Sequence, residues 1–262
     1  MKKLVPAPWD IRIMNITSGL LVMAVLCLSL VAALWWALRH PVFAIQKIAV
    51  YGDTSHHNEV TLRANVMPQL SGNFFTLDLQ HAKEAFEAMP WVRKATVRRE
   101  FPNRLRVRLD EHLPVALWGD NSETSMVNQD GLVFEANVDD IDADKLPVLS
   151  GPTGQSVLVW QMYNYLKPIF GTVSMGVDKL DLSPRGSWRV QTDSDAVIEL
   201  GRGTQEEVGQ RLRVFLNTVA QVTSRYQRTT NSVLAADLRH NNGYALRLRG
   251  VTTLGNDGNK KP

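Results

Sequence analysis

The stretch "PWVRKATVRREFPNRLRVRL", residues 90–109, holds seven arginine or lysine side chains and one acid, Glu100. Two runs with strand-like composition flank the turn signal "FPN", which predicts a β-hairpin. Successive side chains of a strand point to opposite faces, so Leu105, Val107 and Leu109 share one face and the arginines between them share the other. The stretch therefore predicts a strand pair with an apolar face against a core and a basic face in solvent.

The residues before this hairpin predict one strand and two helices. The run "VFAIQKIAVYG", residues 42–52, alternates and ends at a glycine, as a strand does. "NEVTLRANV", residues 58–66, and "NFFTLDLQHAKEAFEAMP", residues 73–90, carry apolar residues at helical spacing, and Pro90 stops the second helix. The order strand, helix, helix, strand, strand predicts an α+β domain in which two helices cover one face of a small antiparallel pair.

Residues 16–38, "ITSGLLVMAVLCLSLVAALWWAL", carry no charge and predict a single transmembrane helix. At ~1.5 Å per residue the run is roughly 35 Å long, enough for a hydrocarbon core of about 30 Å. A cleavable signal peptide would have a shorter apolar region of about 7–15 residues. Lys2, Lys3 and Arg12 precede the span and favour a cytoplasmic N-terminus, residues 1–15, with the bulk of the chain on the other side.

The composition is that of an ordinary folded protein. Of the 262 residues 44% are hydrophobic and 21% are charged, and the net charge of +3 is too small to indicate an anionic partner. The only cysteine is Cys27, which excludes an intrachain disulfide and a zinc site built from several thiolates.

The region after the hairpin predicts a β-rich domain with two helices. Short strands with turns between them surround two amphipathic helices, one from Gln155 to about Phe170 and one that Thr204 caps. The runs "SVLAADLR" and "GYALRLRG" predict two final strands, the second of which leaves a sheet edge near the end of the chain. Residues 251–262 are polar and glycine-rich, and we expect them to be disordered.

These pieces resemble a known family. "IQKIAVYG", "NFFTLD" and the hairpin running into "PVALW" are similar to a POTRA domain of the type found in the bacterial FtsQ/DivIB division proteins. "GSWRV", "ELGRG", "RLRVF" and "ADLR" follow in the order and spacing of that family, so the resemblance covers nearly the whole chain. It implies a POTRA domain over residues 43–112 and an FtsQ-type β domain over 113–250. The sequence departs from the family at His240 and Leu248, where the family often has aromatic residues.

The resemblance also implies a function. Members are non-enzymatic single-pass scaffolds of the bacterial inner membrane that act at the division septum, link early and late division proteins, and take part in controlling septal cell-wall assembly by the synthase complex. The family's C-terminal edge strand receives FtsB, paired with FtsL, which is β-augmentation. Carried over by motif, the partner-binding residues are Arg239, which would pair with a partner carboxylate, and His240, Asn242, Gly243, Tyr244 and Leu248, with Arg185 and Trp188 nearby. Leu246 is expected only to close the sheet.

Other functions find less support in the sequence. Hydrolase and P-loop motifs are absent, and His56–His57 is too small a cluster for a metal, so we expect no catalysis, cofactor, metal or small-molecule substrate. An export component that guides polypeptides to an outer-membrane barrel remains the alternative. We expect no nucleic-acid partner, because the hairpin is expected to lie beyond the inner membrane, where DNA is not normally present. The arginines of the hairpin form a solvated face, a protein-docking surface or a contact with anionic lipid headgroups, and the sequence alone does not distinguish these three interpretations.

Overall fold

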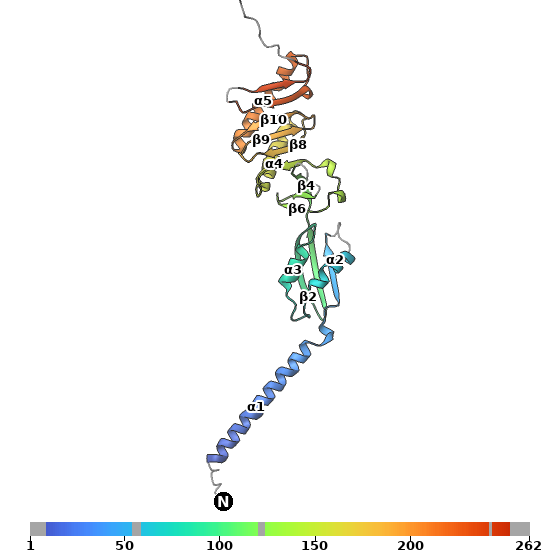
Figure 1. The fold of residues 1–262 in the computed structure, drawn as a ribbon, viewed down its shortest axis with the longest axis vertical. Coiled ribbons are helices and arrows are strands. Elements are labelled where there is room, and N and C mark those ends of the chain that lie inside the picture. Colours follow the sequence, from blue (N-terminus) through green and yellow to red (C-terminus); the bar gives the residue numbers. More distant parts are fainter. Residues whose placement is uncertain (1–8, 54–58, 120–123, 241–242, 252–262) are drawn as a thin grey trace, which may run out of the picture. The chain divides into compact units, whose positions relative to one another are not determined.

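The computed structural model of the chain describes residues 9–53, 59–119, 124–240 and 243–251 (Figure 1). It divides into two compact units, Met1–Glu111 and His112–Pro262. The first unit carries a long apolar helix followed by a small α+β domain, and the second is a β-rich domain with two α-helices. The predicted α+β class and the order of the elements are confirmed.

Helix α1, Trp9–Leu38, is long and apolar enough to cross a membrane, and its apolar side chains are exposed (blue in Figure 1). The helix begins at Trp9, seven residues before the predicted apolar run, which starts at Ile16. The charged residues Asp10 and Arg12 interrupt the apolar composition but not the helical backbone. Residues 1–8 of the expected cytoplasmic N-terminus lie outside the described residues.

Three strands and two α-helices make up the described residues of the domain that follows α1. Their bounds are β1 (Lys47–Gly52), α2 (Glu59–Val66), α3 (Leu79–Glu87), β2 (Val92–Glu100) and β3 (Arg104–Glu111), with 3-10 turns η1 (Pro41–Phe43) and η2 (Met67–Gln69). Strand β3 is central, antiparallel to β2 and parallel to β1. The predicted antiparallel pair is thus correct but incomplete. Parallel neighbours need a long connection, and the segment with α2, α3 and β2 supplies it.

The hairpin β2–β3 has the two faces that its alternation predicts. Leu105, Val107 and Leu109 are completely buried in the core of this domain, together with Phe86 of α3. The arginines between them on β3 are exposed. Burying each apolar side chain stabilises the fold by about 1.5–3 kcal/mol, so the apolar frame of the hairpin, and not its charge, holds this domain together.

In the described part of the second unit, nine strands form one mixed sheet in the order β12-β11-β10-β9-β8-β7-β4-β5-β6. The strands are β4 (Pro114–Trp118), β5 (Ser125–Asn128), β6 (Val133–Glu135), β7 (Val148–Ser150), β8 (Val177–Leu182), β9 (Trp188–Thr192), β10 (Val197–Gly201), β11 (Val233–Asp237) and β12 (Ala245–Leu248). The 3-10 turns η3 (Val138–Asp140) and η4 (Ala143–Lys145) lie between β6 and β7, and η5 (Thr230–Ser232) precedes β11.

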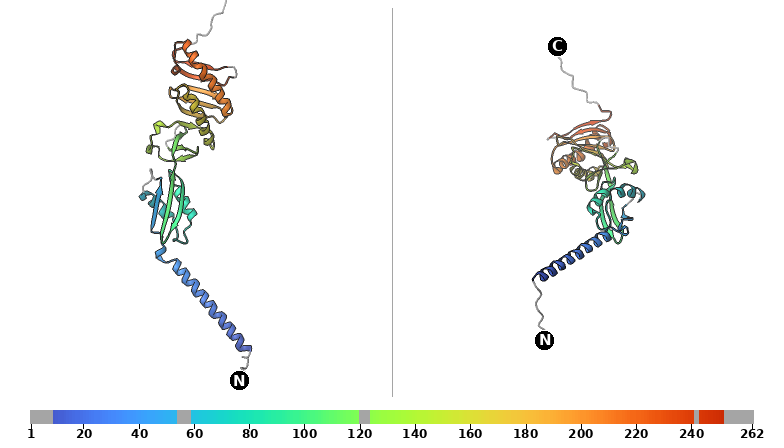
Figure 2. Two further views of the ribbon diagram at one scale, coloured as in Figure 1. Left: turned by 180° about the vertical axis from the view of Figure 1, so that it is seen from behind. Right: turned by 60° about the horizontal axis from the view of Figure 1, so that its bottom comes forward.

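Helices α4 (Ser156–Gly171) and α5 (Gln205–Arg225) cover one face of this sheet. Thr204 and Glu207 form a capping box at the start of α5, and its predicted apolar stripe is buried from Val208 to Val219. Because α5 connects β10 to the parallel strand β11, it supplies the crossover that such a pair requires. Figure 2 shows α5, in orange, lying beside the C-terminal strands. It is the helix closest to the last strand.

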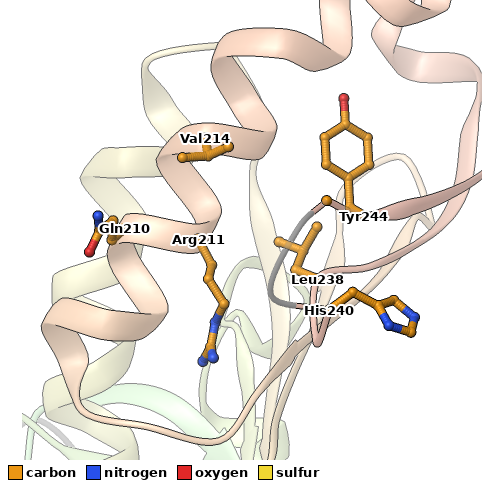
Figure 3. Close-up of a pocket in the computed structure, with 7 residues that line it drawn as sticks. Gln210, Arg211, Val214, Leu238, His240 and Tyr244 are labelled. Carbon is orange, nitrogen blue, oxygen red and sulfur yellow. The ribbon is translucent and has the colours of Figure 1, made fainter.

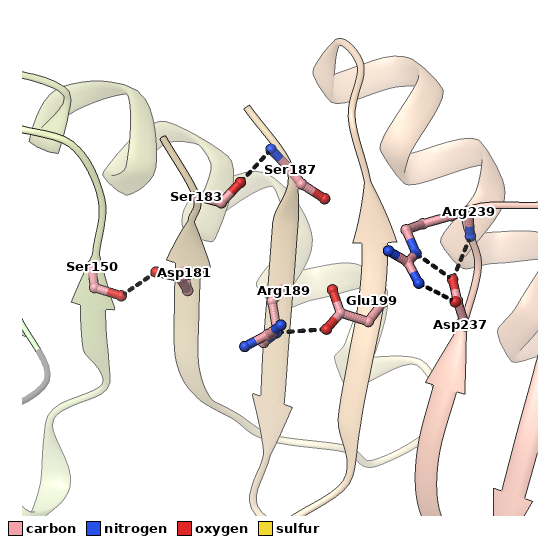
Figure 4. Close-up of polar contacts among 8 residues, drawn as sticks. All are labelled: Ser150, Asp181, Ser183, Ser187, Arg189, Glu199, Asp237 and Arg239. Carbon is pink, nitrogen blue, oxygen red and sulfur yellow. Dashed lines mark hydrogen bonds and ion pairs between the residues drawn. The ribbon is translucent and has the colours of Figure 1, made fainter. Parts of the chain in front are cut away.

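The opposite face of the sheet carries polar contacts that join neighbouring strands, with the helices behind them (Figure 4). Arg189 of β9 donates to Glu199 of β10 at 2.6 Å, and Ser150 of β7 donates to Asp181 of β8 at 2.8 Å. This face is therefore polar where the helix-covered face is apolar, as alternation along the strands requires.

Candidate partner-binding edge

Strand β12 forms one end of the nine-stranded sheet. It pairs antiparallel with β11, and no described strand pairs with its other side. Leu246 and Leu248 face the core under α5, whereas Arg247 is exposed on the polar face. Arg249, just after the strand, is exposed too. The edge thus presents a row of backbone groups with two arginines along it, which is a template for another strand.

Tyr244 fixes the start of this edge strand to helix α5. Its hydroxyl lies 2.9 Å from the hydroxyl of Thr218, and its ring packs edge-on against Phe215 with ring centres 5.0 Å apart. Figure 3 shows Tyr244 beside α5, with the ring of His240 directed away from the helix. Between α5 and the start of β12 lies a hollow of about 260 Å³. The hollow is lined by Gln210, Arg211, Val214, Leu238, His240, Gly243 and Tyr244. The exposed side chain of Val214 gives it an apolar wall.

A second, basic hollow adjoins the first, and Arg211 lines both. It measures about 440 Å³ and is bordered by the turn between β8 and β9, the end of β10 and the residues after β11. Four arginines line it together with small residues: Arg185, Arg202, Arg211 and Arg239. Guanidinium groups at this density favour a carboxylate-bearing ligand.

Arg239 already has an internal partner. Its Nε donates to one carboxylate oxygen of Asp237 at 2.8 Å, and its Nη2 donates to the other at 2.6 Å (Figure 4). The backbone N–H of Arg239 donates to the same carboxylate at 3.0 Å. These hydrogen bonds, before the charge of the arginine itself, lower the pKa of Asp237 to about 2. Asp237 therefore fixes the direction of the guanidinium, whose other N–H groups stay available in a side chain that is 58% exposed.

The structure brings most of the predicted site residues together. Arg239 and Arg185 line the basic hollow, and His240, Gly243 and Tyr244 line the hollow beside α5. Asn242 lies outside the described residues. The remaining two are in the core, with Leu248 only 6% and Trp188 only 3% exposed. Leu248 packs on the inner face of the edge strand, whereas Trp188 begins β9, which β10 and β11 separate from β12. Neither presents a contact surface in this arrangement.

Sequence reasoning missed the part of the site that α5 contributes. Gln210, Arg211 and Val214 come close to the edge strand only because α5 crosses from β10 to β11. One signal was available, since Val214 is an apolar residue that falls outside the buried stripe of an amphipathic helix. Asp237 was missed as well, although side chains two residues apart in an extended segment share one face and can pair, as Arg108 and Asp110 of β3 do.

The described residues contain no group of three or more metal-ligating side chains. The pair His56–His57, weighed as a metal site from the sequence, lies outside the residues that the structure describes.

Comparison with known proteins matches both units. The family model "POTRA domain, FtsQ-type" matches residues 43–112, and "Cell division protein FtsQ/DivIB, C-terminal" matches residues 116–239. Three relatives, each named cell division protein FtsQ, match along most of their length. The protein of Burkholderia pseudomallei is 37% identical over 94% of this chain and 96% of its own. The protein of Thiomonas arsenitoxydans is 38% identical over 95% and 91%, and that of Bordetella pertussis is 36% identical over 91% and 92%.

The matches cover the POTRA-type domain and the β-rich domain in the order in which the structure has them, and the N-terminal apolar helix fits a single-pass membrane protein. The identities and coverage settle the family and a role in cell division. The chain belongs to the FtsQ/DivIB family of cell division proteins.

Proposed function

We propose that this protein is a non-enzymatic scaffold that binds an FtsB–FtsL-like pair through the outer edge of β12. The observation that carries the proposal is the open edge of the nine-stranded sheet, with an apolar wall on α5 and a basic hollow beside it. Main-chain hydrogen bonds along β12 would supply affinity, and the two hollows would supply specificity.

The charges around the edge favour an acidic partner strand. Arg247 and Arg249 lie along the edge, and Arg239 lies at the rim of the basic hollow. Cross-strand pairs of opposite charge stabilise a sheet by about 0.2–1 kcal/mol each. We therefore infer that the added strand carries carboxylates at alternate positions, on the face it shares with Arg247.

The proposal includes a place in the cell. The N-terminus is cytoplasmic, α1 spans the inner membrane, and both folded domains lie beyond it at the division septum, where the scaffold links early division proteins to the cell-wall synthase complex. The weak excess of basic residues before α1 supports this orientation. This orientation can be tested with a reporter enzyme that is active only outside the cytoplasm, fused after residue 251. If the C-terminal part were cytoplasmic, the reporter would be inactive.

Charge reversal at the edge tests the binding site. The full-length chain is co-expressed with FtsB-like and FtsL-like proteins and purified from membranes. We expect Arg247→Glu to reduce the co-purified pair by about tenfold, which corresponds to ~1.4 kcal/mol of lost binding free energy. The change introduces a carboxylate where the partner strand is expected to carry its own.

Lys179→Glu is the matched control, because Lys179 is an exposed cation on strand β8 of the same sheet. It should leave the yield of the pair unchanged, and both variants should melt at the temperature of the unchanged protein. Equal capture by all three proteins would rule out the β12 edge as the binding site.

A further inference from the structure

Four phenylalanines from three separate segments gather where α1 joins the POTRA-type domain. Phe43 belongs to η1, Phe74 and Phe75 to the segment between η2 and α3, and Phe101 to the turn between β2 and β3. The ring centres of Phe43 and Phe75 are 5.0 Å apart, and those of Phe74 and Phe101 are 5.9 Å apart. We call these four residues the phenylalanine cluster.

The phenylalanine cluster is not part of the domain core. None of its members belongs to the buried cluster around Leu105 and Phe86. Phe101 is 72% exposed and Phe75 is 44% exposed, and the neighbouring Val42 is 52% exposed. Exposing a group of large apolar side chains to water is unfavourable, and such groups mark surfaces that contact a protein or a membrane.

One hydrogen bond ties the segment of Phe74 and Phe75 to the end of α1, and two others join the three segments to one another. The side-chain amide of Asn73 donates to the carbonyl of Leu38, the last residue of α1, at 2.5 Å. The N–H of Phe74 donates to the carbonyl of Phe43 at 2.8 Å, and the N–H of Gln46 donates to the carbonyl of Asn103 at 3.1 Å. The phenylalanine cluster therefore lies next to the point where α1 would leave the bilayer.

Basic side chains accompany the phenylalanine cluster at this end of the domain. Arg39 stacks over the ring of Trp35 at 4.0 Å, immediately after α1. Lys47 and Arg104, the first residues of β1 and β3, are opposite each other in the sheet and both exposed. Cations beside exposed aromatic rings are the combination that binds the headgroup region of an anionic membrane.

We propose that the phenylalanine cluster inserts into the interfacial layer of the bilayer that α1 spans, so that the POTRA-type domain is held to the membrane surface by a second contact. The inference rests on α1 being a membrane span. The occupant is the lipid surface itself and not a protein, because the cluster is tied to the last residue of α1, while Trp35 marks the helix end with an interfacial side chain.

Lipid contact can be measured at single positions in the full chain. In a Cys27→Ala background, Phe101→Cys and Phe75→Cys each receive an environment-sensitive fluorophore, and three of the four rings remain in each variant. The proteins are placed in nanodiscs of mixed zwitterionic and anionic lipid that carry a spin-label quencher at headgroup depth. We expect a blue-shifted emission and roughly twofold or stronger quenching at both positions.

Two controls make the result decisive. Tyr51→Cys labels another exposed aromatic position, at the opposite end of β1, and should show neither the shift nor the quenching. A label on the native Cys27, in the middle of α1, reports whether the helix is inserted, through quenchers placed deep in the bilayer.

If Cys27 is inserted while positions 75 and 101 behave like position 51, the proposal is wrong, and a protein becomes the better occupant for the phenylalanine cluster. If Cys27 is not inserted, the premise of a membrane span fails instead. Repeating the measurement with zwitterionic lipid alone separates the two contributions to membrane contact. The attraction of the basic side chains should weaken when anionic lipid is removed, whereas insertion of the aromatic rings should not.

Discussion

At the scale of single residues, the pair Asp237–Arg239 determines how the basic hollow presents its charge. Two side-chain hydrogen bonds hold the guanidinium in a bidentate arrangement. An arginine that is held in one orientation loses less side-chain entropy when a partner binds than a free one does. Asp237 therefore acts as a positioning residue for Arg239.

The stability that this pair contributes should depend on pH. The folded-state pKa of Asp237 is about 2, below its ordinary value of 3.8, so folding favours the ionised carboxylate. The stabilisation is complete above about pH 4 and is lost as the pH falls towards 2. Asp237→Asn should lower the unfolding free energy of the second unit by about 0.5–1 kcal/mol at pH 7, since the pair is partly solvent-screened, and by less at pH 3.

Urea unfolding at the two pH values measures this difference. In an Arg239→Met background, Asp237→Asn should have almost no effect at pH 7, because the partner is already gone. A constant effect of Asp237→Asn at both pH values would show that the ion pair is not its cause.

At the scale of secondary-structure elements, a glycine sets the distance between α4 and α5. Gly209 of α5 is buried, and a Cβ atom built on it would lie 2.5 Å from the hydroxyl of Tyr165 on α4. The next atoms of the same ring would be 2.6 and 2.9 Å away. A Cβ atom at position 209 would therefore force the ring of Tyr165 to move.

Gly209→Ala should consequently destabilise the second unit by about 1–3 kcal/mol, although alanine is the better helix former by roughly 1 kcal/mol. Tyr165→Leu should relieve the clash, so that the double variant is more stable than additivity predicts. Gly171→Ala is the control, since a Cβ there meets no atom within 4 Å. Thermal unfolding compares the four proteins, and an unchanged or raised melting temperature for Gly209→Ala would contradict the close contact.

Local patterns predicted the elements better than they predicted the site. Alternation alone placed Leu105, Val107 and Leu109 on the buried face of β3, because strand periodicity is a property of neighbouring residues. The joining of Arg185 to Arg239 depends on sheet order, which puts the β8–β9 turn and the end of β11 at the same hollow. The order of strands in a sheet cannot be predicted from the pattern of neighbouring residues.

In the last strand, the two-residue periodicity of strand side chains would have predicted the environment of Leu248 correctly. Leu246 and Leu248 share one face of "GYALRLRG" because they are two residues apart. The structure packs both against the core, so Leu248 belongs with Leu246, and a substitution such as Leu248→Glu would test folding as much as binding. Arg247, between them, is the exposed position at which a side-chain change can report on a partner.

At the scale of the whole molecule, the two units have separate hydrophobic cores. Phe86 belongs to one and Phe215 to the other, and among the described residues no buried residue belongs to both. Each unit therefore satisfies the main requirement for folding as a unit of its own.

Core truncations should then act locally. Phe86→Ala should destabilise the first unit by about 3–5 kcal/mol, and Phe215→Ala should do the same to the second. Hydrogen exchange read by mass spectrometry assigns the loss of protection to one unit or the other. Loss of protection in both units after either single change would show that they unfold together.

Arg247 of β12 and Arg249 just after it also oppose the pairing of this edge with the same edge of a second copy. If two copies of this protein met edge to edge in antiparallel register centred on position 247, Arg247 would face Arg247, and Ala245 would face Arg249. Like charges directly opposite each other destabilise a strand pair, and charged edge residues are a common protection against aggregation. The same side chains that we expect to favour an acidic partner strand thus discourage self-assembly, so the edge of β12 can stay unpaired at high concentrations of this protein.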